Sequence, residues 1–353
     1  MSLESRLTFS SRERSETMDE AEAGVIRYLS RIQEAQREFD DIVAGKTVLL
    51  VDSGQGVPQH AFARRVENLR GMGFEALSKM VIEKIFGGKV PASALESFQQ
   101  FLGHGVRIVH RDVADTTSLP SDISAVVFSG SPADVSKAFS DPSRSIHRDS
   151  RLTHGQVFQF VRRVYEGAAE KNIPIIGFCY GHQAMAALEG GKVSPLKEPR
   201  QRFQKMELLD DSREFLGGVF VDRPPLSIHG GELPVNHSEA VTPNPQRSML
   251  LMHTTERDSL VAEGLLHLSG LENKYSGTPQ ERAALLQSLL EDDKGAAKLG
   301  IQAHPEIAGF YPMMNFSLGA DPSVFRRSAE NDISPEMLRL IARFLQLHKK
   351  FRA

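Results

Sequence analysis

The chain contains a single cysteine, Cys179, and its setting is suited to a sulfur nucleophile. It follows the apolar run Ile173–Phe178 and precedes a helical stretch from about Gly181 to Glu189, within the sequence G-F-C-Y-G. Small residues at a strand-to-helix turn let the backbone bend sharply and present one side chain above the sheet. The partial positive charge of a helix N-terminus favours a thiolate there. The pattern therefore predicts a nucleophilic cysteine, the alternative being an inert buried thiol.

Cysteine catalysis also needs a base that takes up the thiol proton and a group that orients this base. His304 and Glu306 lie two residues apart in I-Q-A-H-P-E, at the end of a predicted strand over Leu299–His304. Side chains two apart in an extended segment point to the same side. Pro305 between them stiffens the backbone. The spacing therefore allows the carboxylate to hold the imidazole, provided that the fold brings Cys179 opposite.

Two further segments contain groups that could bind a substrate. Ser129-Gly130-Ser131-Pro132 follows the apolar run Ala125–Phe128, and free backbone N–H groups in such a turn suit an oxyanion or a carboxylate. Many turns between strands and helices share this composition, so the turn alone predicts little. Farther along, L-P-V-N-H-S-E-A-V places His237 beside Ser238. A surface or structural histidine is as good an interpretation of His237 as a substrate contact.

Strands that alternate with helices would position these residues. Continuous apolar runs are typical of strands buried on both faces, and they alternate here with helical patterns, which predicts a parallel sheet with helices on both faces. Two later segments resemble antiparallel strands, and a capping box at Thr278–Glu281 opens a helix. The expected strands are Thr47–Asp52, Val106–His110, Ala125–Phe128, Ile173–Phe178, Met249–His253, Asp258–Glu263 and Leu299–His304. The expected helices include about 18–43, Val157–Lys171, Gly181–Glu189, 278–293 and 334–349.

Composition excludes several classes of function. With 353 residues, 40% hydrophobic content and a net charge of −3, the chain has the composition of an ordinary globular protein without the basic excess of a nucleic-acid binder. One cysteine excludes an intramolecular disulfide and any cysteine-based zinc site, and the histidines show no paired ligand spacing, so we expect no metal and no cofactor. No apolar run reaches the roughly 18 residues of a membrane span. The polar N-terminus does not resemble a signal peptide, which makes the cytoplasm the expected location.

Taken together, four motifs resemble the class I glutamine amidotransferase family, the group with a Cys–His–Glu triad. G-F-C-Y-G-H-Q and I-Q-A-H-P-E resemble the segments of its triad. V-V-F-S-G-S-P resembles its S-G-G-P oxyanion turn, with Ser131 in place of the usual second glycine, and N-H-S-E-A-V resembles its S-H-x-D-x-V segment. The resemblance covers roughly residues 46–316 and implies a three-layer αβα, flavodoxin-like fold with a mostly parallel central sheet.

The resemblance also implies a role for each matching residue. Cys179 corresponds to the nucleophile that attacks a γ-glutamyl amide and forms a thioester, His304 to the base and later the acid, and Glu306 to the group that orients it. The backbone N–H groups of Tyr180 and of the Gly130–Ser131 turn correspond to the oxyanion hole. The positions that match the site for the amino-acid end of the substrate are Gln183, His237 and Ser238.

The residue patterns and the resemblance together predict three parts of the chain. Residues 1–45 are expected to form a disordered segment and an amphipathic helix, which packs either on the domain or on a dimer partner. Residues 46–320 are expected to form the amidotransferase-like domain, with insertions at about 74–103 and 271–298. Residues 321–353 are expected to form a C-terminal helix packed on this domain. We expect no synthetase domain in the chain.

Three functional hypotheses remain open on the sequence alone. The first is a glutaminase that hydrolyses glutamine and passes ammonia to a separate synthetase or acceptor subunit. The second is a stand-alone γ-glutamyl peptidase or hydrolase acting on a γ-glutamyl metabolite, because the same triad would serve with a different leaving amine. The third is a non-catalytic regulatory protein that retains the fold.

Overall fold

The structure is a computed structural model and describes only part of the chain. Described are residues 30–53, 107–111, 118–148, 150–205, 207–208, 232–256, 259–268, 278–291, 297–303 and 334–348, with residues 23, 27 and 351. The predicted N-terminal disordered segment, the predicted insertion at 74–103, and His304 and Glu306 lie outside the described residues. The account below concerns the described part.

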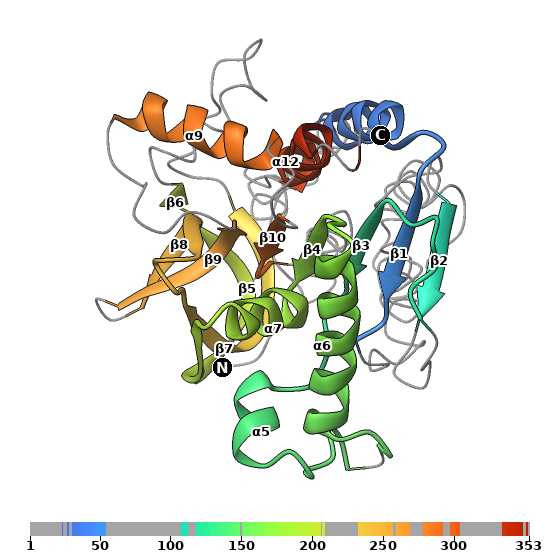
Figure 1. The fold of residues 1–353 in the computed structure, drawn as a ribbon. Coiled ribbons are helices and arrows are strands. Elements are labelled where there is room, and N and C mark those ends of the chain that lie inside the picture. Colours follow the sequence, from blue (N-terminus) through green and yellow to red (C-terminus); the bar gives the residue numbers. More distant parts are fainter. Residues whose placement is uncertain are drawn as a thin grey trace, which may run out of the picture.

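A central sheet of eight strands organises the described part of the chain, in the order β2-β1-β3-β4-β10-β9-β8-β6 (Figure 1). The first five strands pair in parallel, and β9, β8 and β6 continue the sheet in antiparallel pairing. The strands are β1 (Thr47–Val51), β2 (Arg107–Arg111), β3 (Ala125–Phe128), β4 (Ile175–Phe178), β6 (Glu207–Leu208), β8 (Ser248–Glu256), β9 (Ser259–His267) and β10 (Lys298–Ile301). The prediction of a mostly parallel α/β sheet is confirmed.

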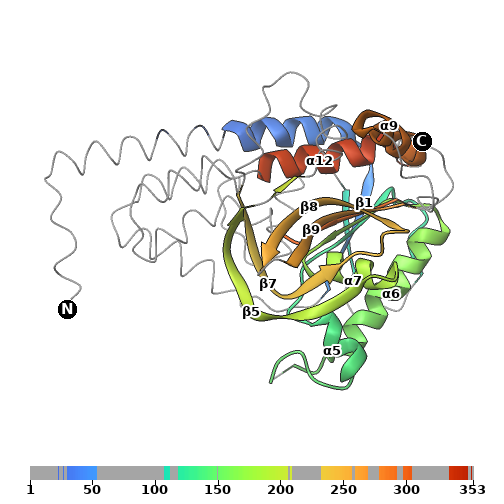
Figure 2. The ribbon, with the colours of Figure 1, turned by 90° about the vertical axis from the view of Figure 1, so that its left-hand side faces the viewer.

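Helices cover both faces of the sheet, as the continuous apolar runs require. Figure 2 shows the helix of residues 30–43 with α9 and α12 on one side and α5, α6 and α7 on the other. Alternate residues of β1 enter two separate hydrophobic cores, with Val48 and Leu50 in one and Leu49 and Val51 in the other. The helices with bounds are α5 (Val135–Ser140), α6 (His154–Glu170), α7 (Tyr180–Leu188), α9 (Pro279–Glu291) and α12 (Ser334–Leu347).

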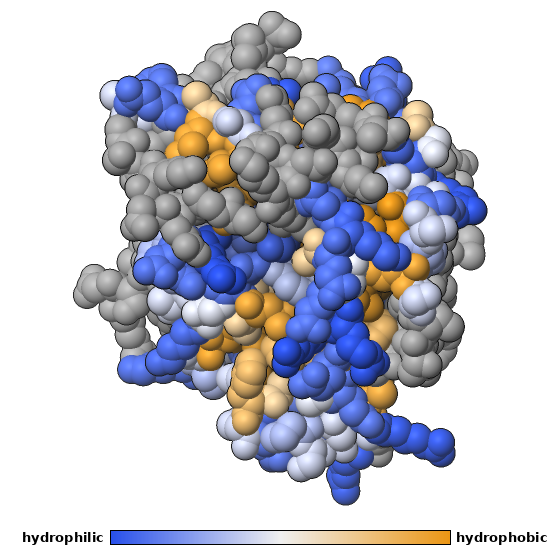
Figure 3. Space-filling view, in the orientation of Figure 1, coloured by the Kyte–Doolittle hydropathy of each residue, from blue (hydrophilic) through white to orange (hydrophobic). Residues whose placement is uncertain are grey.

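Capping residues explain where two of these helices begin. The N-cap Thr153 and Gln156 form a reciprocal capping box at the start of α6, three residues before the predicted start of this helix. At α9 the predicted capping box is confirmed, because the Thr278 backbone N–H donates to Glu281 at 2.7 Å and the Glu281 N–H donates to the Thr278 hydroxyl at 3.3 Å. The outer face of α6 is hydrophilic in Figure 3, as an amphipathic helix on the surface requires.

A second sheet of two strands was not predicted from the sequence. β5 (Lys192–Lys205) and β7 (Glu232–Thr242) pair in antiparallel fashion, with an irregular register between Pro195 and Arg200. The two prolines of β5 conceal the strand in the sequence, because proline cannot donate to a ladder and argues against a strand. Proline is tolerated at a bulge: Pro199 lies in the stretch where the register shifts, and Pro195, paired with Glu239, is the last residue before it.

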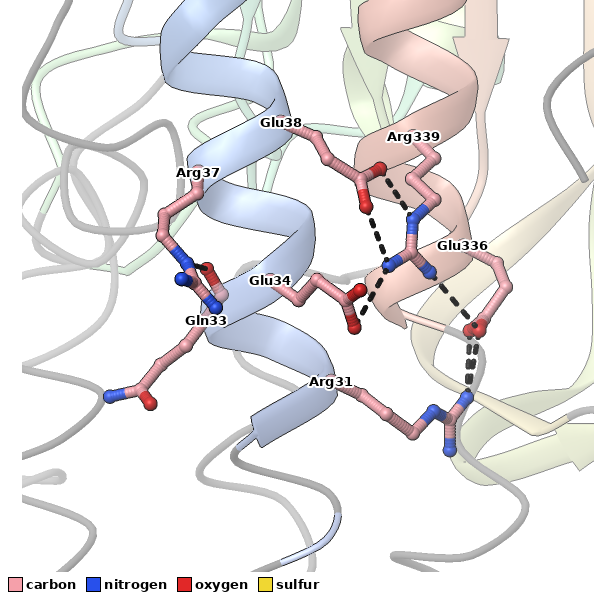
Figure 4. Close-up of polar contacts among 7 residues, drawn as sticks. All are labelled: Arg31, Gln33, Glu34, Arg37, Glu38, Glu336 and Arg339. Carbon is pink, nitrogen blue, oxygen red and sulfur yellow. Dashed lines mark hydrogen bonds and ion pairs between the residues drawn. The ribbon is translucent and has the colours of Figure 1, made fainter. Parts of the chain in front are cut away.

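The helix of residues 30–43 packs on α12 of the same chain. Ala35, Phe39 and Val43 belong to the same hydrophobic core as the apolar face of α12. Ion pairs flank this contact (Figure 4): Arg339 lies 2.7 Å from Glu38, and Arg31 lies 2.9 Å from Glu336. Of the two alternatives for the amphipathic helix, the structure therefore shows packing within the chain. The domain boundaries at residues 45 and 320 remain predictions.

None of the helices in the described ranges combines the length and the apolar character that a membrane span requires.

Candidate active site

Cys179 occupies a sharp turn between β4 and α7. Its backbone angles, φ 48° and ψ −105°, lie outside the regions that a residue with a side chain normally adopts. Such a conformation costs on the order of 1–3 kcal/mol and persists only where the surroundings impose it. Here the Cys179 N–H donates to the Ile301 carbonyl at 2.8 Å, and the Cys179 carbonyl accepts from the Gln183 N–H at 3.0 Å. The turn is therefore fixed on both sides, by β10 and by the first turn of α7.

Glycine is required at two positions around this turn because the elements cross closely. A Cβ added to Gly181 would lie 2.7 Å from the Phe128 Cβ, at the end of β3, and 3.0 Å from the Phe128 carbonyl oxygen. A Cβ added to Gly177 would lie 2.6 Å from the backbone of Gly181. The start of α7 thus rests against the ends of β3 and β4. The small residues of G-F-C-Y-G are explained by this contact.

The Gly130–Ser131 turn follows β3 at the same edge of the sheet. β3 and β4 are parallel neighbours, with Phe128 opposite Gly177, so the chain leaves both strands side by side. The Ser131 hydroxyl accepts from the Ala133 N–H at 3.0 Å, and the Ser129 hydroxyl accepts from the Ser53 N–H at 3.1 Å. Ser131, the residue that replaces glycine in the S-G-G-P pattern, therefore stabilises the turn through its own side chain.

Tyr180 is the first residue of α7, and its side chain is fully buried. Burial raises the pKa of its phenol, and the negative charges of Glu239 and Asp134 raise this pKa further. In the described part of the chain the phenol oxygen has no hydrogen-bond partner. Tyr180 is thus neutral, and its backbone N–H, at the N-terminus of the helix, is the group that matches an oxyanion donor.

Gln183 lies one turn into α7, and it is buried rather than open to a ligand. Its side-chain amide donates to the Gln302 side-chain oxygen at 3.2 Å. The Gln302 backbone N–H in turn donates to the Glu263 carbonyl of β9 at 2.8 Å. Gln183 therefore joins the elbow helix to the segment that leaves β10. A direct substrate contact of Gln183 remains a prediction.

The segment that carries His304 and Glu306 begins next to the elbow. β10 and β4 are parallel neighbours, and Ile301 lies opposite Phe178. The chain leaves β10 through Gln302 and Ala303, both of which are fully buried. β10 thus ends beside the end of β4, which Cys179 follows, and His304 and Glu306 lie outside the described residues. Their assignment stays a prediction.

His237 and Ser238 differ in their surroundings. The His237 side chain is buried, its Nδ1 lies 2.8 Å from the Glu239 carbonyl oxygen, and its Nε2 lies 3.7 Å from a Glu263 carboxylate oxygen. The interpretation of His237 as a surface residue is therefore wrong, and these contacts favour a structural role. Ser238 is exposed, and its hydroxyl donates to the Asp134 carboxylate at 3.0 Å.

Sequence reasoning missed a second set of polar residues beside the Gly130–Ser131 turn. The Glu239 carboxylate accepts from the backbone N–H groups of Val135 and Ser136, each at 2.7 Å, and desolvation raises its pKa. The His154 Nδ1 accepts from the Asp134 N–H at 2.9 Å. Burial lowers the pKa of His154, which keeps the accepting nitrogen unprotonated. Glu239 stands in the N-H-S-E motif, but the sequence does not indicate a partner 104 residues away.

Two further observations concern possible metal ligands and surface hollows. Among the described residues, no three His, Cys, Asp or Glu side chains are arranged to hold a metal ion. An open hollow of about 690 Å³ lies between α5 and α6, lined in part by Pro142, Thr153 and Arg163. None of the described candidate residues lines this hollow. The candidate site is therefore defined by the Cys179 turn and its neighbours rather than by the hollow.

One family model matches the chain over about half of its length. The family model described as "Glutamine amidotransferase class-I" matches residues 93–270, about half of the chain. This range includes Cys179, the Gly130–Ser131 turn and His237, and it ends before His304.

A curated relative and several solved structures are similar to the chain. The GMP synthase [glutamine-hydrolyzing] of Clostridium perfringens (strain 13 / Type A) is 28% identical over an alignment of 145 residues, and the match covers 35% of this chain and 28% of that protein. The chain thus spans less than a third of the length of this relative. A glutamine amidotransferase from Thermotoga maritima aligns over 87% of this chain and 99% of its own, with 14% identity and a TM-score of 0.43. A glutamine amidotransferase from Methylobacillus flagellatus aligns over 85% of this chain and 92% of its own, with 14% identity and a TM-score of 0.39.

Proposed function

Because the chain belongs to the glutamine amidotransferase class-I family, we propose that it hydrolyses the γ-amide of glutamine through a thioester on Cys179. The observation that carries this proposal is the conformation of Cys179. A residue with a side chain is held at φ 48° between a buried strand and a helix N-terminus, beside a turn of small residues. Strained backbone of this kind is characteristic of a nucleophile elbow.

In the proposed reaction, His304 takes the proton of the Cys179 thiol, and the sulfur attacks the amide carbon of the substrate. The carbonyl oxygen becomes an oxyanion that accepts from the backbone N–H groups of Tyr180 and of the Gly130–Ser131 turn. His304 then gives its proton to the leaving nitrogen, and the C–N bond breaks to release ammonia and leave a γ-glutamyl thioester. Glu306 orients the imidazole throughout.

Hydrolysis of the thioester completes the proposed cycle. A water molecule attacks the thioester carbon while His304 takes its proton. The C–S bond then breaks, glutamate leaves, and the thiolate recovers the proton. Each proton taken by His304 is returned, so the enzyme ends in its starting state. Losing one donor of an oxyanion hole typically costs about 10²–10³-fold in rate, so the loss of a donor from the turn is expected to lower the rate strongly, but less than the loss of the base.

The amino-acid end of the substrate would bind on the β7 side of the elbow. Of the three candidates, Ser238 is the best suited to direct contact because its side chain is exposed. His237 and Gln183 are buried, with protein partners for their side-chain atoms. We therefore propose Ser238 as the direct contact, and a direct contact of His237 or Gln183 with the substrate remains a prediction.

We propose that a separate synthetase or acceptor subunit uses the ammonia. The support is the matched relative, whose name describes a glutamine-hydrolysing GMP synthase and of which this chain spans 28%. The proposal specifies the acceptor only by its chemistry: the acceptor is an electrophile that reacts with ammonia. A stand-alone γ-glutamyl hydrolase differs from this proposal only in the leaving amine, which the test below varies.

An ammonia-release assay with matched substrates tests the proposal. Purified full-length protein is incubated with glutamine and with γ-glutamyl amides of larger amines, and the amine released is measured against Cys179→Ala. Release from glutamine by the wild type alone supports the glutaminase. Faster release from the larger amides would instead identify a γ-glutamyl hydrolase. Equal release by the wild type and Cys179→Ala, on every substrate, would refute the proposed chemistry.

A further inference from the structure

The N-terminus of α5 is held by side chains from distant parts of the chain. α5 has only six residues, and its N-cap residue, Asp134, forms no side-chain cap. Four consecutive backbone N–H groups at this point each donate to a side-chain acceptor instead. The pairs are Ala133 with Ser131, Asp134 with His154, and Val135 and Ser136 with Glu239.

Two neighbouring residues of β7, Ser238 and Glu239, contact the N-terminus of α5. Glu239 accepts both of its hydrogen bonds at 2.7 Å, and its neighbour Ser238 donates to the Asp134 carboxylate at 3.0 Å. Glu239 is 2% exposed, so its carboxylate depends on these donors and on the positive end of the helix for solvation. We call Asp134, Ser238 and Glu239, with the N–H groups of Val135 and Ser136, the β7–α5 clamp.

The β7–α5 clamp lies within a few residues of the proposed oxyanion turn. Only Pro132, Ala133 and Asp134 separate Ser131 from the first residue that Glu239 holds. Three residues span at most about 10 Å when extended, and here they are confined by the Ser131 and His154 hydrogen bonds. A displacement of the α5 N-terminus would therefore also move the Gly130–Ser131 turn, because the three residues between them have little conformational freedom.

The clamp also adjoins the elbow itself. α5 packs against α7, whose first residue is Tyr180, and the negative charges of Glu239 and Asp134 add to the effect of burial in raising the pKa of the Tyr180 phenol. The backbone N–H of Tyr180 is the second proposed oxyanion donor. The short helix that Glu239 holds therefore follows one proposed donor along the chain and contacts the helix that begins with the other. Glu239 itself comes from β7, the strand proposed to bind the amino-acid end of the substrate.

We propose that Glu239 is a positioning residue that links the β7 segment to the Gly130–Ser131 turn and fixes the oxyanion donors. This inference rests on the proposed function, since it assigns a role within the same site. Glu239 does not touch the reacting atoms. Glu239 holds the N-terminus of α5, so that the preceding turn presents its backbone N–H groups where the oxyanion develops. Stabilisation of the oxyanion is needed only in the chemical step.

Glu239→Gln tests this role with little change of volume. The amide keeps one acceptor oxygen for one N–H group, but it turns an NH₂ group toward the other and removes the negative charge. The matched control is Glu281→Gln, because Glu281 also accepts a backbone N–H at a helix start, at 2.7 Å in α9, and is exposed. Three quantities are measured for each protein: kcat and KM for ammonia release from glutamine, and the rate of Cys179 alkylation by iodoacetamide.

Alkylation by iodoacetamide needs the thiolate but forms no oxyanion, so the pair of reactions separates positioning from general damage. We expect Glu239→Gln to lower kcat by about 10- to 100-fold, with KM changed by less than about threefold and the alkylation rate by less than about twofold. Glu281→Gln should match the wild type in all three. If Glu239→Gln does not fold, judged by its circular dichroism, Glu239→Asp is measured in the same way. Its carboxylate is one methylene shorter and cannot reach both N–H groups.

Two different failures are distinguishable. If the wild type is active and Glu239→Gln has the same kcat, the inference alone is overturned. The inference is also overturned if Glu239→Gln loses ammonia release and Cys179 alkylation in parallel, because such a loss indicates a merely structural role. Wild type that alkylates readily at Cys179 but releases no amine from any γ-glutamyl substrate would overturn the proposed function, and the inference with it.

Discussion

Replacing Gly181 by alanine should disturb the elbow through one contact whose size the structure gives. The added Cβ would lie 2.7 Å from the Phe128 Cβ and 3.0 Å from the Phe128 carbonyl oxygen. Carbon atoms make favourable contact at about 3.5–4.0 Å, so α7 and the end of β3 must separate by roughly 1 Å. Neither partner is the tip of a flexible side chain, which leaves only backbone movement to relieve the clash.

This separation should cost more in activity than in stability. Overpacking of this kind costs about 1–3 kcal/mol, which lowers the Tm by roughly 1–4 °C in a chain of 353 residues. Misplacing catalytic groups by about 1 Å can cost about 100-fold in rate, and Gly181 lies two residues from Cys179. We therefore expect Gly181→Ala to fold, to melt about 1–4 °C lower, and to lose about two orders of magnitude in kcat for glutamine.

Gly167→Ala provides the matched control. Its added Cβ would lie 3.0 Å from a terminal methyl carbon of Leu119, which can rotate away, and Gly167 lies within α6, three residues before its last residue, Glu170. Alanine is favoured over glycine there by up to about 1 kcal/mol, so the Tm should stay level or rise and kcat should not change. Differential scanning calorimetry and ammonia release measure both variants. Wild-type activity in Gly181→Ala would refute the claim that the close crossing fixes the nucleophile.

Three further predictions concern the triad, the terminal helices and the response to pH. Cys179→Ala and His304→Ala should each lower kcat by about 10⁴-fold or more and Glu306→Gln by less, in steady-state assays; equal small losses would contradict the assigned roles. Arg339→Ala should lower the free energy of unfolding by about 1–2 kcal/mol in urea titrations, because it removes the bonds to Glu38. Arg343→Ala, whose partner is Gln346 at 3.3 Å, should cost less, and an equal cost would count against the ion pairs. Because the pKa of His154 is lowered in the folded state, its contribution to stability is full above the unfolded pKa of about 6.5 and is lost as pH falls below it. His154→Asn keeps an acceptor without a titrating group, so its Tm should decline less than that of the wild type between pH 7 and 5; parallel declines would exclude this role.

The parallel half of the fold was predictable because its strands are short and apolar throughout. Ala125–Phe128 was predicted with the bounds that the structure gives, and Thr47–Asp52 differs by one residue. Such runs occur where both faces are covered, and the two cores on either side of β1 show this directly. The pair β8 and β9 was predicted as antiparallel, but both strands are longer than expected.

β5 could not be found by the same reasoning. Its 14 residues include Pro195 and Pro199 and several charged side chains, so neither apolar alternation nor strand propensity indicates it. The strand forms because β7 pairs with it from a distant part of the sequence, with a register shift that accommodates the prolines. Tertiary pairing here overrides local preference.

The candidate site divides in the same way. The Cys179 turn was predictable because a local pattern of small residues encodes it. The β7–α5 clamp was not, because Glu239 and Val135 meet only after the sheet has formed, 104 residues apart. The burial of His237 was likewise not predictable, because it depends on contacts with Glu239 and Glu263 that the sequence alone does not indicate.

Labelling with a diazo-ketone analogue of glutamine tests the central claim most directly. The analogue carries the amino-acid end of glutamine and an electrophilic carbon in place of the amide, so a site built for glutamine directs it to the nucleophile. Peptide mass spectrometry should find one label per chain, on Cys179, with ammonia release lost in proportion and with protection by excess glutamine. A chain that is labelled elsewhere, or that releases ammonia at an undiminished rate after Cys179 is labelled, would contradict the account.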